Sequence, residues 1–112
     1  MDCIFCKIVN GIIPSKEIYS DEVCYAFADI NPQAPVHCLI VPRIHLDSLD
    51  EVNLENKDTV AHILAVIPTI AKKLGLENGY RVITNIGKDG AQSVKHLHFH
   101  LLGGKTLSEN MA

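Results

Sequence analysis

The sequence has no long apolar run, although 47% of its 112 residues are hydrophobic. Runs such as "CLIV" and "ILAVI" are far shorter than the roughly 20 residues that a membrane-spanning helix needs. The first residues, "MDCIFCKIVNG", also lack the basic region followed by an apolar stretch that marks an export signal. We therefore expect a cytoplasmic protein that has no membrane partner.

Clusters of lysine and arginine are absent as well. The chain has 13 acidic and 10 basic residues, which gives a formal net charge of −3. Nucleic-acid binding depends heavily on neutralising phosphates, so we expect no nucleic-acid partner. Any phosphate bound by this chain must be held by local geometry.

Internal repeats, low-complexity segments and linkers are also missing from the chain. A length of 112 residues is near the usual size of one domain. We expect a single domain that spans residues 1–112.

The apolar pattern predicts a helix, three strands, a second helix and two strands. The first helix covers 3–10 and ends at Gly11, and a long amphipathic helix over 59–74 ends at Gly75 with a kink at Pro68. The predicted strands are 17–21, 22–30, 36–43, 80–86 and 94–102. This order predicts an α+β domain with an antiparallel sheet.

Three of the six histidines, His96, His98 and His100, alternate in the segment "HLHFHLL". In a strand they share one face, while Leu97, Phe99 and Leu101 fill the core face. A solvated polar face would be the plain interpretation, but strict alternation of a scarce residue favours chemistry. Grouped imidazoles can bind a metal or attack phosphorus near neutral pH. The preceding loop "GKDGAQS" can present backbone N–H groups to a phosphate, which favours phosphoryl or nucleotidyl transfer.

These motifs resemble the histidine triad (HIT) superfamily, whose signature alternates three histidines with apolar residues as "HLHFHLL" does. Further segments are similar to its Hint branch, the histidine-triad nucleotide-binding proteins: "CIFCKI", "DINPQAPVHCLIVPRIH", "GYRVITN" and "GAQSVKHLHFHLLGG". The resemblance implies a HIT-like fold, with a five-stranded antiparallel sheet, one long helix and a short N-terminal helix.

The resemblance also implies a phosphoramidase mechanism. His98 would attack the α-phosphorus of a purine nucleoside 5′-phosphoramidate, and water would then release the nucleoside monophosphate from the nucleotidyl-histidine. The backbone carbonyl of His96 would orient the His98 ring. His100 and Ser93 would hydrogen-bond the phosphate and the leaving group, and His37 would assist the proton network. Asn85 and the backbone N–H groups near Ala91 and Gln92 would complete the phosphate cradle.

For the nucleoside, the carboxylate of Asp29 suits the two ribose hydroxyls. The resemblance implies that Asp29 and Ile30 contact the ribose of an AMP-like or GMP-like ligand. Five apolar residues would form a slot for the purine: Phe5, Ile8, Ile13, Phe27 and Leu39. Taken alone, each of these five residues would be assigned to the core.

The four cysteines are expected to be thiols or metal ligands, because the chain has no export signal. Cys24 and Cys38 lie in apolar segments and are expected to be buried. Cys3 and Cys6 form a CxxC pair, and many bacterial HIT proteins resemble this chain in adding two histidines, here His45 and His96. Together they would form a closed tetrahedral site for structural Zn²⁺, and plain thiols are the alternative.

Two other functions stay open, namely dinucleoside polyphosphate hydrolysis and a zinc-stabilised nucleotide-binding scaffold with little turnover.

The resemblance further implies a homodimer, in which the helix at 58–74 and the strand at 80–86 make the contact. The tail "KTLSENMA" departs from the eukaryotic Hint tail, which contains tryptophan and proline; this chain has no tryptophan.

Overall fold

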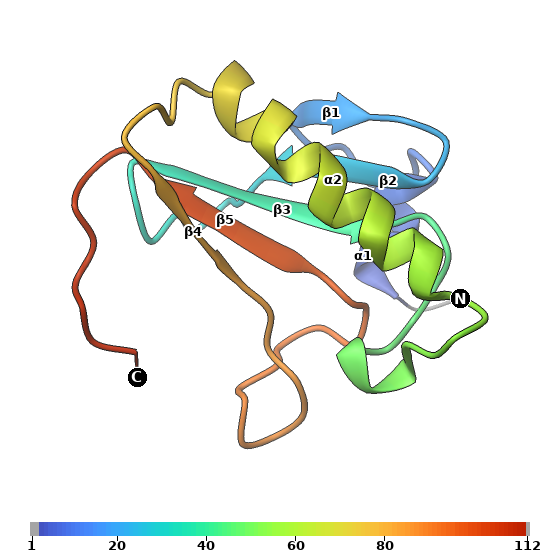
Figure 1. The fold of residues 1–112 in the computed structure, drawn as a ribbon. Coiled ribbons are helices and arrows are strands. Elements are labelled where there is room, and N and C mark those ends of the chain that lie inside the picture. Colours follow the sequence, from blue (N-terminus) through green and yellow to red (C-terminus); the bar gives the residue numbers. More distant parts are fainter. Residues whose placement is uncertain (1–2, 112) are drawn as a thin grey trace.

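The structure, a computed structural model, describes residues 3–111. In chain order these residues form α1 (Ile4–Val9), β1 (Glu17–Ser20), β2 (Cys24–Ala28), β3 (Val36–Pro42), the 3-10 helix η1 (Leu49–Glu51), α2 (Lys57–Lys73), β4 (Tyr80–Ile83) and β5 (Phe99–Gly103). The strands make one antiparallel sheet in the order β1-β2-β3-β5-β4 (Figure 1). The predicted α+β class, the five-stranded sheet and the two helices are confirmed; η1 was not predicted.

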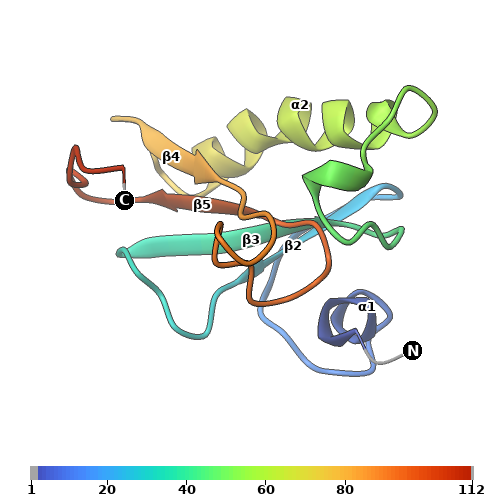
Figure 2. The same ribbon diagram turned by 90° about the horizontal axis from the view of Figure 1, so that it is seen from below.

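The two helices cover opposite faces of the sheet (Figure 2). On the α2 side, Ile63, Ile67 and Ile70 pack in one buried cluster with Ile40 and Leu101 of the sheet. Full burial of one such side chain contributes about 1.5–3 kcal/mol to folding. A smaller buried cluster lies on the α1 side and contains Phe5, Tyr25, Phe27, Leu39 and Val41. The central strand β3 is therefore buried on both faces.

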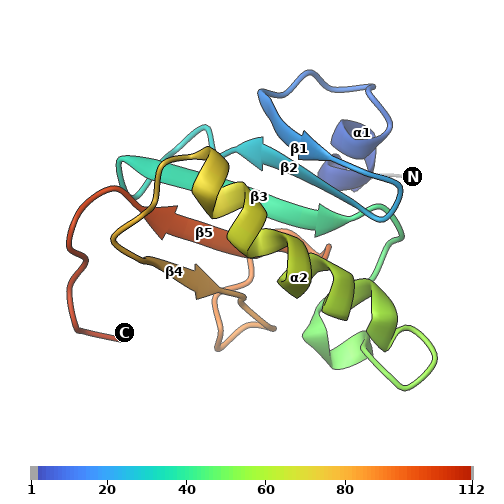
Figure 3. The same ribbon diagram turned by 45° about the horizontal axis from the view of Figure 1, so that its top comes forward.

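The helix α2 lies across the sheet (Figure 3) and buries the residues that recur at three- and four-residue steps. It runs through Pro68, which is exposed. Proline removes the donor for the carbonyl of Leu64, a residue that is 51% exposed. The helix ends in a Schellman motif at Gly75, where φ is 75° in the left-handed region: Gly75 N–H donates to the Lys72 carbonyl and Leu76 N–H to the Ala71 carbonyl. Within residues 3–111 no helix combines the length and the apolar character needed to cross a bilayer.

The last two strands are shorter than predicted. β4 ends at Ile83 and β5 begins only at Phe99, so residues 84–98 lie outside the sheet ladder. The backbone of this segment bonds elsewhere: His96 N–H donates to the Val94 carbonyl, and Leu97 N–H donates to the Leu46 carbonyl. His96 and His98 therefore lie on the segment that enters β5, and only His100 lies within the strand.

The predicted alternation of side chains still holds through this segment. Leu97, Phe99 and Leu101 belong to the cluster under α2, whereas the Phe5 ring of α1 contacts the rings of His96 and His98. The helix α1 covers part of the histidine face: His96 is 0% exposed and His98 is 3% exposed.

Candidate functional site

His98 is held by contacts on both sides of its ring. Its Nδ1 lies 2.7 Å from the backbone carbonyl oxygen of His96, which can only accept, so Nδ1 carries the proton. The ring of Phe5 meets the His98 ring edge-on, with centroids 5.1 Å apart. The hydroxyl of Thr84 donates to the His98 backbone carbonyl at 2.8 Å. These contacts leave the Nε2 of His98 with a lone pair and without a partner among residues 3–111.

The neighbouring ring of His100 is linked to His37 and Asp29. His100 Nδ1 lies 2.9 Å from His37 Nε2, which in turn lies 3.4 Å from Asp29 Oδ2. Leu39 is the β3 residue directly opposite His100, so His37 takes the diagonal position on the same face. The rings of His98 and His100 are 5.1 Å apart between centroids. Four predicted site residues therefore lie in one group.

Burial favours the neutral form of two histidines in this group, His37 and His100. Burial lowers the pKa of His100 to about 4, with further lowering by the nearby His98 and His37, while Asp29 acts in the opposite sense. Burial also lowers the pKa of His37, again against the raising effect of Asp29. Near pH 7 both imidazoles are therefore uncharged.

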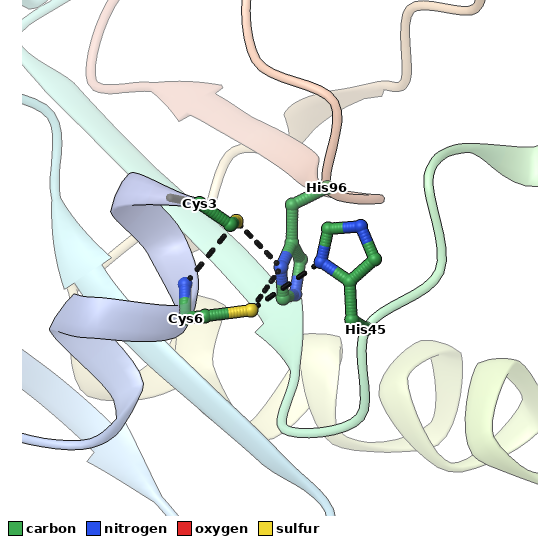
Figure 4. A group of neighbouring side chains, drawn as sticks. All are labelled: Cys3, Cys6, His45 and His96. Carbon is green, nitrogen blue, oxygen red and sulfur yellow. Dashed lines mark hydrogen bonds between the residues drawn. The ribbon is translucent and has the colours of Figure 1, made fainter. Parts of the chain in front are cut away.

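A second group contains the four predicted metal ligands (Figure 4). The Sγ of Cys6 lies 3.3 Å from His45 Nδ1 and 3.5 Å from His96 Nδ1, and the Sγ of Cys3 lies 3.3 Å from His96 Nδ1. A tetrahedral zinc ion with bonds of 2.0–2.3 Å separates its ligands by about 3.5 Å. The donor set and its spacing therefore fit zinc.

Outer contacts orient both ligand histidines. His45 Nε2 lies 2.7 Å from Asp47 Oδ1, and His96 Nε2 lies 2.9 Å from the Pro42 carbonyl oxygen. Each acceptor takes an Nε2 proton and leaves a lone pair on Nδ1, as is usual for metal-binding histidines. Burial and the adjacent Cys3 raise the pKa of Cys6 to about 11. A metal cation bound there would favour the thiolate form of Cys6.

The loop before β5 is held by its own hydrogen bonds. The backbone N–H groups of Ala91 and Gln92 donate to the carbonyls of Lys88 and Gly87, at 3.1 and 3.0 Å. These two bonds close the loop through a turn in which Ala91 has φ of 59°, and the predicted phosphate cradle near Ala91 and Gln92 stays a prediction. The Asn85 side chain also holds this loop, donating to the Gly90 carbonyl at 2.7 Å.

Ser93 is exposed and lines a shallow pocket beside the metal-ligand group, together with Cys3, Ile4, His45, Asp47, Val94 and Lys95. Within the part of the chain that the structure describes, its hydroxyl makes no hydrogen bond to a triad ring. Its predicted contact with phosphate or leaving group stays a prediction.

The predicted purine slot is brought together in part. Phe5, Phe27 and Leu39 share one buried cluster with Tyr25 and Val41, and Ile8 and Val94 pack against it. Ile13 is half-buried and lies outside this cluster. Asp29 is half-buried, whereas Ile30 is 93% exposed.

Four contributors to the site were not predicted: Gln33, Pro42, Asp47 and Thr84. Gln33 and Pro42 act through backbone groups, at His37 Nδ1 and His96 Nε2, and residue type gives no signal for such contacts. Asp47 could have been found, because it lies two residues after the predicted ligand His45 and metal-binding histidines often donate to a carboxylate.

Comparisons with known proteins agree with this geometry. A sequence profile of the HIT domain matches residues 10–107. A HIT-like protein of Buchnera aphidicola is 50% identical over 107 residues, which cover 95% of this chain and 96% of that protein. Among solved structures, a histidine triad protein from Clostridium difficile has 53% identity and a TM-score of 0.95, with coverage of 98% of this chain and 96% of the other. A HIT family hydrolase from Clostridium thermocellum has 43% identity and a TM-score of 0.96, with coverage of 99% and 97%.

Proposed function

The chain belongs to the HIT family, and we propose that it is a nucleotide hydrolase of the Hint type that cleaves purine nucleoside 5′-phosphoramidates. The observation that carries the proposal is the arrangement of His98, whose Nδ1–H donates to the His96 carbonyl at 2.7 Å. A neutral imidazole fixed in this way has its lone pair at Nε2, and that lone pair is what nucleophilic attack on phosphorus requires.

The proposed reaction has two steps. His98 Nε2 forms a bond to the α-phosphorus while the bond from phosphorus to the amine breaks, and the amine leaves with a proton taken from solvent. A water molecule then attacks the phosphorus, the bond to Nε2 breaks, and the nucleoside monophosphate leaves as a proton returns to solvent. His98 keeps its Nδ1 proton in both steps. His100 and Ser93 supply hydrogen-bond donors where charge develops on oxygen or on the leaving group.

For recognition of the nucleotide, we propose that Asp29 binds the ribose hydroxyls next to the triad. This position is supported by the 3.4 Å separation between Asp29 Oδ2 and His37 Nε2. Ile30, at 93% exposed, is free to cover the sugar. The edge of the cluster around Phe5, Ile8, Phe27 and Leu39 would contact the purine of an AMP-like or GMP-like ligand.

A structural zinc ion is proposed for Cys3, Cys6, His45 and His96. When bound, it would supply four bonds that tie α1 to the segment entering β5. His96 then has two separate tasks, because its ring would hold the metal while its backbone carbonyl orients His98. His98 itself contributes no atom to the metal-ligand group.

We further propose that residues 1–112 form one HIT domain, that the protein is cytoplasmic and that two copies form a dimer. The dimer proposal is supported by exposed apolar residues on α2 and on the edge strand β4: Leu64, Tyr80, Val82 and Ile83.

The function is tested by incubating the protein with adenosine 5′-phosphoramidate and following AMP release. Steady release under multiple turnover is expected, and a His98→Asn variant serves as the matched control. Faster cleavage of a diadenosine polyphosphate than of the phosphoramidate would favour the dinucleotide hydrolase. Tight AMP binding without turnover of either compound would favour the scaffold.

A further inference from the structure

A chain of two hydrogen bonds leads from the loop before β3 to His100. The backbone N–H of Gln33 donates to His37 Nδ1 at 3.0 Å. A backbone amide can only donate, so His37 Nδ1 must accept. A neutral His37, 8% exposed, therefore carries its proton on Nε2.

The second hydrogen bond determines which ring nitrogen of His100 carries the proton. His37 Nε2 lies 2.9 Å from His100 Nδ1, and with the proton on His37 the His100 nitrogen must accept. A neutral His100 therefore carries its proton on Nε2. Among residues 3–111 every buried side-chain nitrogen or oxygen has a partner, and the Nε2 of His100 has none, so this N–H is open to a ligand.

From these two hydrogen bonds we propose that the Gln33 amide and His37 act as positioning groups that fix His100 as a neutral donor at Nε2. His98, two residues away, is fixed in the opposite form by the His96 carbonyl. The two neighbouring rings thus present one lone pair and one N–H, which suits attack on a phosphorus whose oxygens gain charge. The role toward phosphate rests on the proposed function, whereas the tautomers do not.

The charges around His100 agree with a neutral ring. The titratable groups that face it are His98 on the same segment, His37 on β3 and Asp29 beyond His37. A second proton on His100 would occupy Nδ1 and oppose the Nε2–H of His37. To avoid that clash, His37 would have to move its proton to Nδ1 and give up the bond from Gln33. The low pKa of His100, about 4 and caused first by burial, is consistent with this conflict.

The tautomers can be read from two-bond ¹⁵N–¹H spectra of the full chain with ¹⁵N-labelled histidine, and this needs no substrate. At pH 7 we expect Nε2–H for His37 and His100, assigned with His37→Gln and His100→Gln variants, and a His100 that stays neutral down to about pH 5. An Nδ1–H form or a cation for His100 at pH 7 would overturn the proposal. These spectra decide the question even if no nucleotide is turned over.

Two pairs of variants separate positioning from simple packing. Gln33→Pro removes the amide proton, whereas Gln33→Ala keeps it. His37→Leu removes the donor to His100, whereas His37→Gln keeps an N–H in that direction. In the first member of each pair the single His100 tautomer should be lost, and its titration midpoint should rise above about 4 but stay below the ordinary 6.5, because the ring remains buried. In the second member of each pair, the tautomer and the titration midpoint of His100 should match those of the unmodified protein. Equal spectra within both pairs would overturn the proposal.

For the rate of AMP release, His37→Leu should move the acid side of the pH profile upward by less than about two pH units, with rescue in His37→Gln. A uniform fall in rate at every pH in both variants would assign His37 a packing role only.

Discussion

The histidines of this protein differ in chemistry because their ring nitrogens have different neighbours. His96 faces the Pro42 carbonyl with Nε2, at 2.9 Å, and turns Nδ1 toward the cysteine sulfurs. His98 is held the other way round, with Nδ1 at 2.7 Å from the His96 carbonyl. One residue type at alternate positions therefore presents Nδ1 as the free nitrogen in His96 and Nε2 in His98, and backbone carbonyls make the distinction.

The clearest prediction at this scale concerns His98. His98→Asn should lower AMP release by on the order of 10³-fold or more, because it removes the lone pair proposed to attack phosphorus. AMP affinity should change by only a few fold, since the groups expected to bind the nucleoside are untouched. Steady-state rates and titration calorimetry measure the two effects. His62→Asn on α2 is the control, and full activity in His98→Asn would refute the nucleophile.

Asp29→Ala should weaken AMP binding roughly 10- to 100-fold, since charge-assisted hydrogen bonds contribute about 1.5–3 kcal/mol each. Because Asp29 also lies near His37, the ribose contribution needs its own control. Binding of 2′,3′-dideoxy-AMP should be similar in the variant and the unmodified protein. An unchanged AMP affinity in Asp29→Ala would remove Asp29 from the ribose site.

At the scale of elements, the carboxylate of Asp21 joins the β1–β2 hairpin to α2. Its Oδ1 accepts from the backbone N–H groups of Val23 and Cys24, both at 2.8 Å. Its Oδ2 lies 2.8 Å from the Tyr19 hydroxyl and 2.7 Å from His62 Nε2 on α2. Burial alone would raise the pKa of Asp21, but these hydrogen bonds, first that from His62, outweigh it and hold the pKa well below its usual value.

A carboxylate with a lowered pKa stabilises the fold above its unfolded pKa, and this contribution is lost as the pH falls. Asp21→Asn should therefore cost about 1–2 kcal/mol in the free energy of unfolding at pH 7. The cost should be the same at pH 5 and shrink below pH 3.8, the ordinary value for Asp21. Urea unfolding of both proteins measures it, with the exposed neighbour Glu22→Gln as the control. A cost that does not vary with pH would assign Asp21 a role that does not depend on its charge.

The order of helices and strands could be predicted because it depends on local periodicity. The core contacts of α2 repeat along its own sequence, and Gly75 ends the helix where a left-handed residue is needed. The start of β5 could not be predicted, because the residues before Phe99 have strand-like alternation but bond to Leu46 and Val94 instead of a ladder. The triad was predicted from residue type and spacing, and the four expected metal ligands from the resemblance to HIT proteins. The contributions of Gln33 and Pro42 were not, since they depend on backbone groups brought close only by folding.

At the scale of the whole molecule, β4 is an edge of the sheet with exposed apolar residues. Val82 lies opposite Leu101, a residue of the core under α2, so its side chain is on the α2 face, where it is 38% exposed. Leu64 on α2 is 51% exposed. Open edges and exposed apolar residues of this kind are commonly covered by a second copy.

We therefore predict a homodimer at micromolar concentration, with twice the chain mass of 12.3 kDa in light scattering. The double variant Leu64→Glu, Val82→Glu should be monomeric, because it would bury two charges in the contact. Ile12→Glu, at a residue 70% exposed and far along the chain from α2 and β4, is the control and should stay dimeric. A monomeric mass for the unmodified protein would refute this prediction.

Zinc is expected to stabilise the whole molecule without entering the chemical step. Cys3 and Cys6 come from the start of the chain, whereas His45 follows β3 and His96 precedes β5. An ion bound by all four would connect three distant segments, and protein purified without chelator should contain about one zinc per chain. Chelation should lower the melting temperature by roughly 10–20 °C. AMP release per folded molecule should change much less, since His98 is outside the ligand set.

The double variant Cys3→Ser, Cys6→Ser should melt near the chelated protein and respond no further to chelator, which is the matched control. Protein without zinc, or a double variant with an unchanged melting temperature, would identify the cysteines as ordinary thiols. A different result would be more damaging: activity lost in proportion to zinc removed, with melting and fold intact. A metal that only holds α1 against the segment entering β5 can change the rate only by changing the stability of that contact. Activity lost without any loss of stability would therefore place the metal in the reaction and displace His98 as the nucleophile.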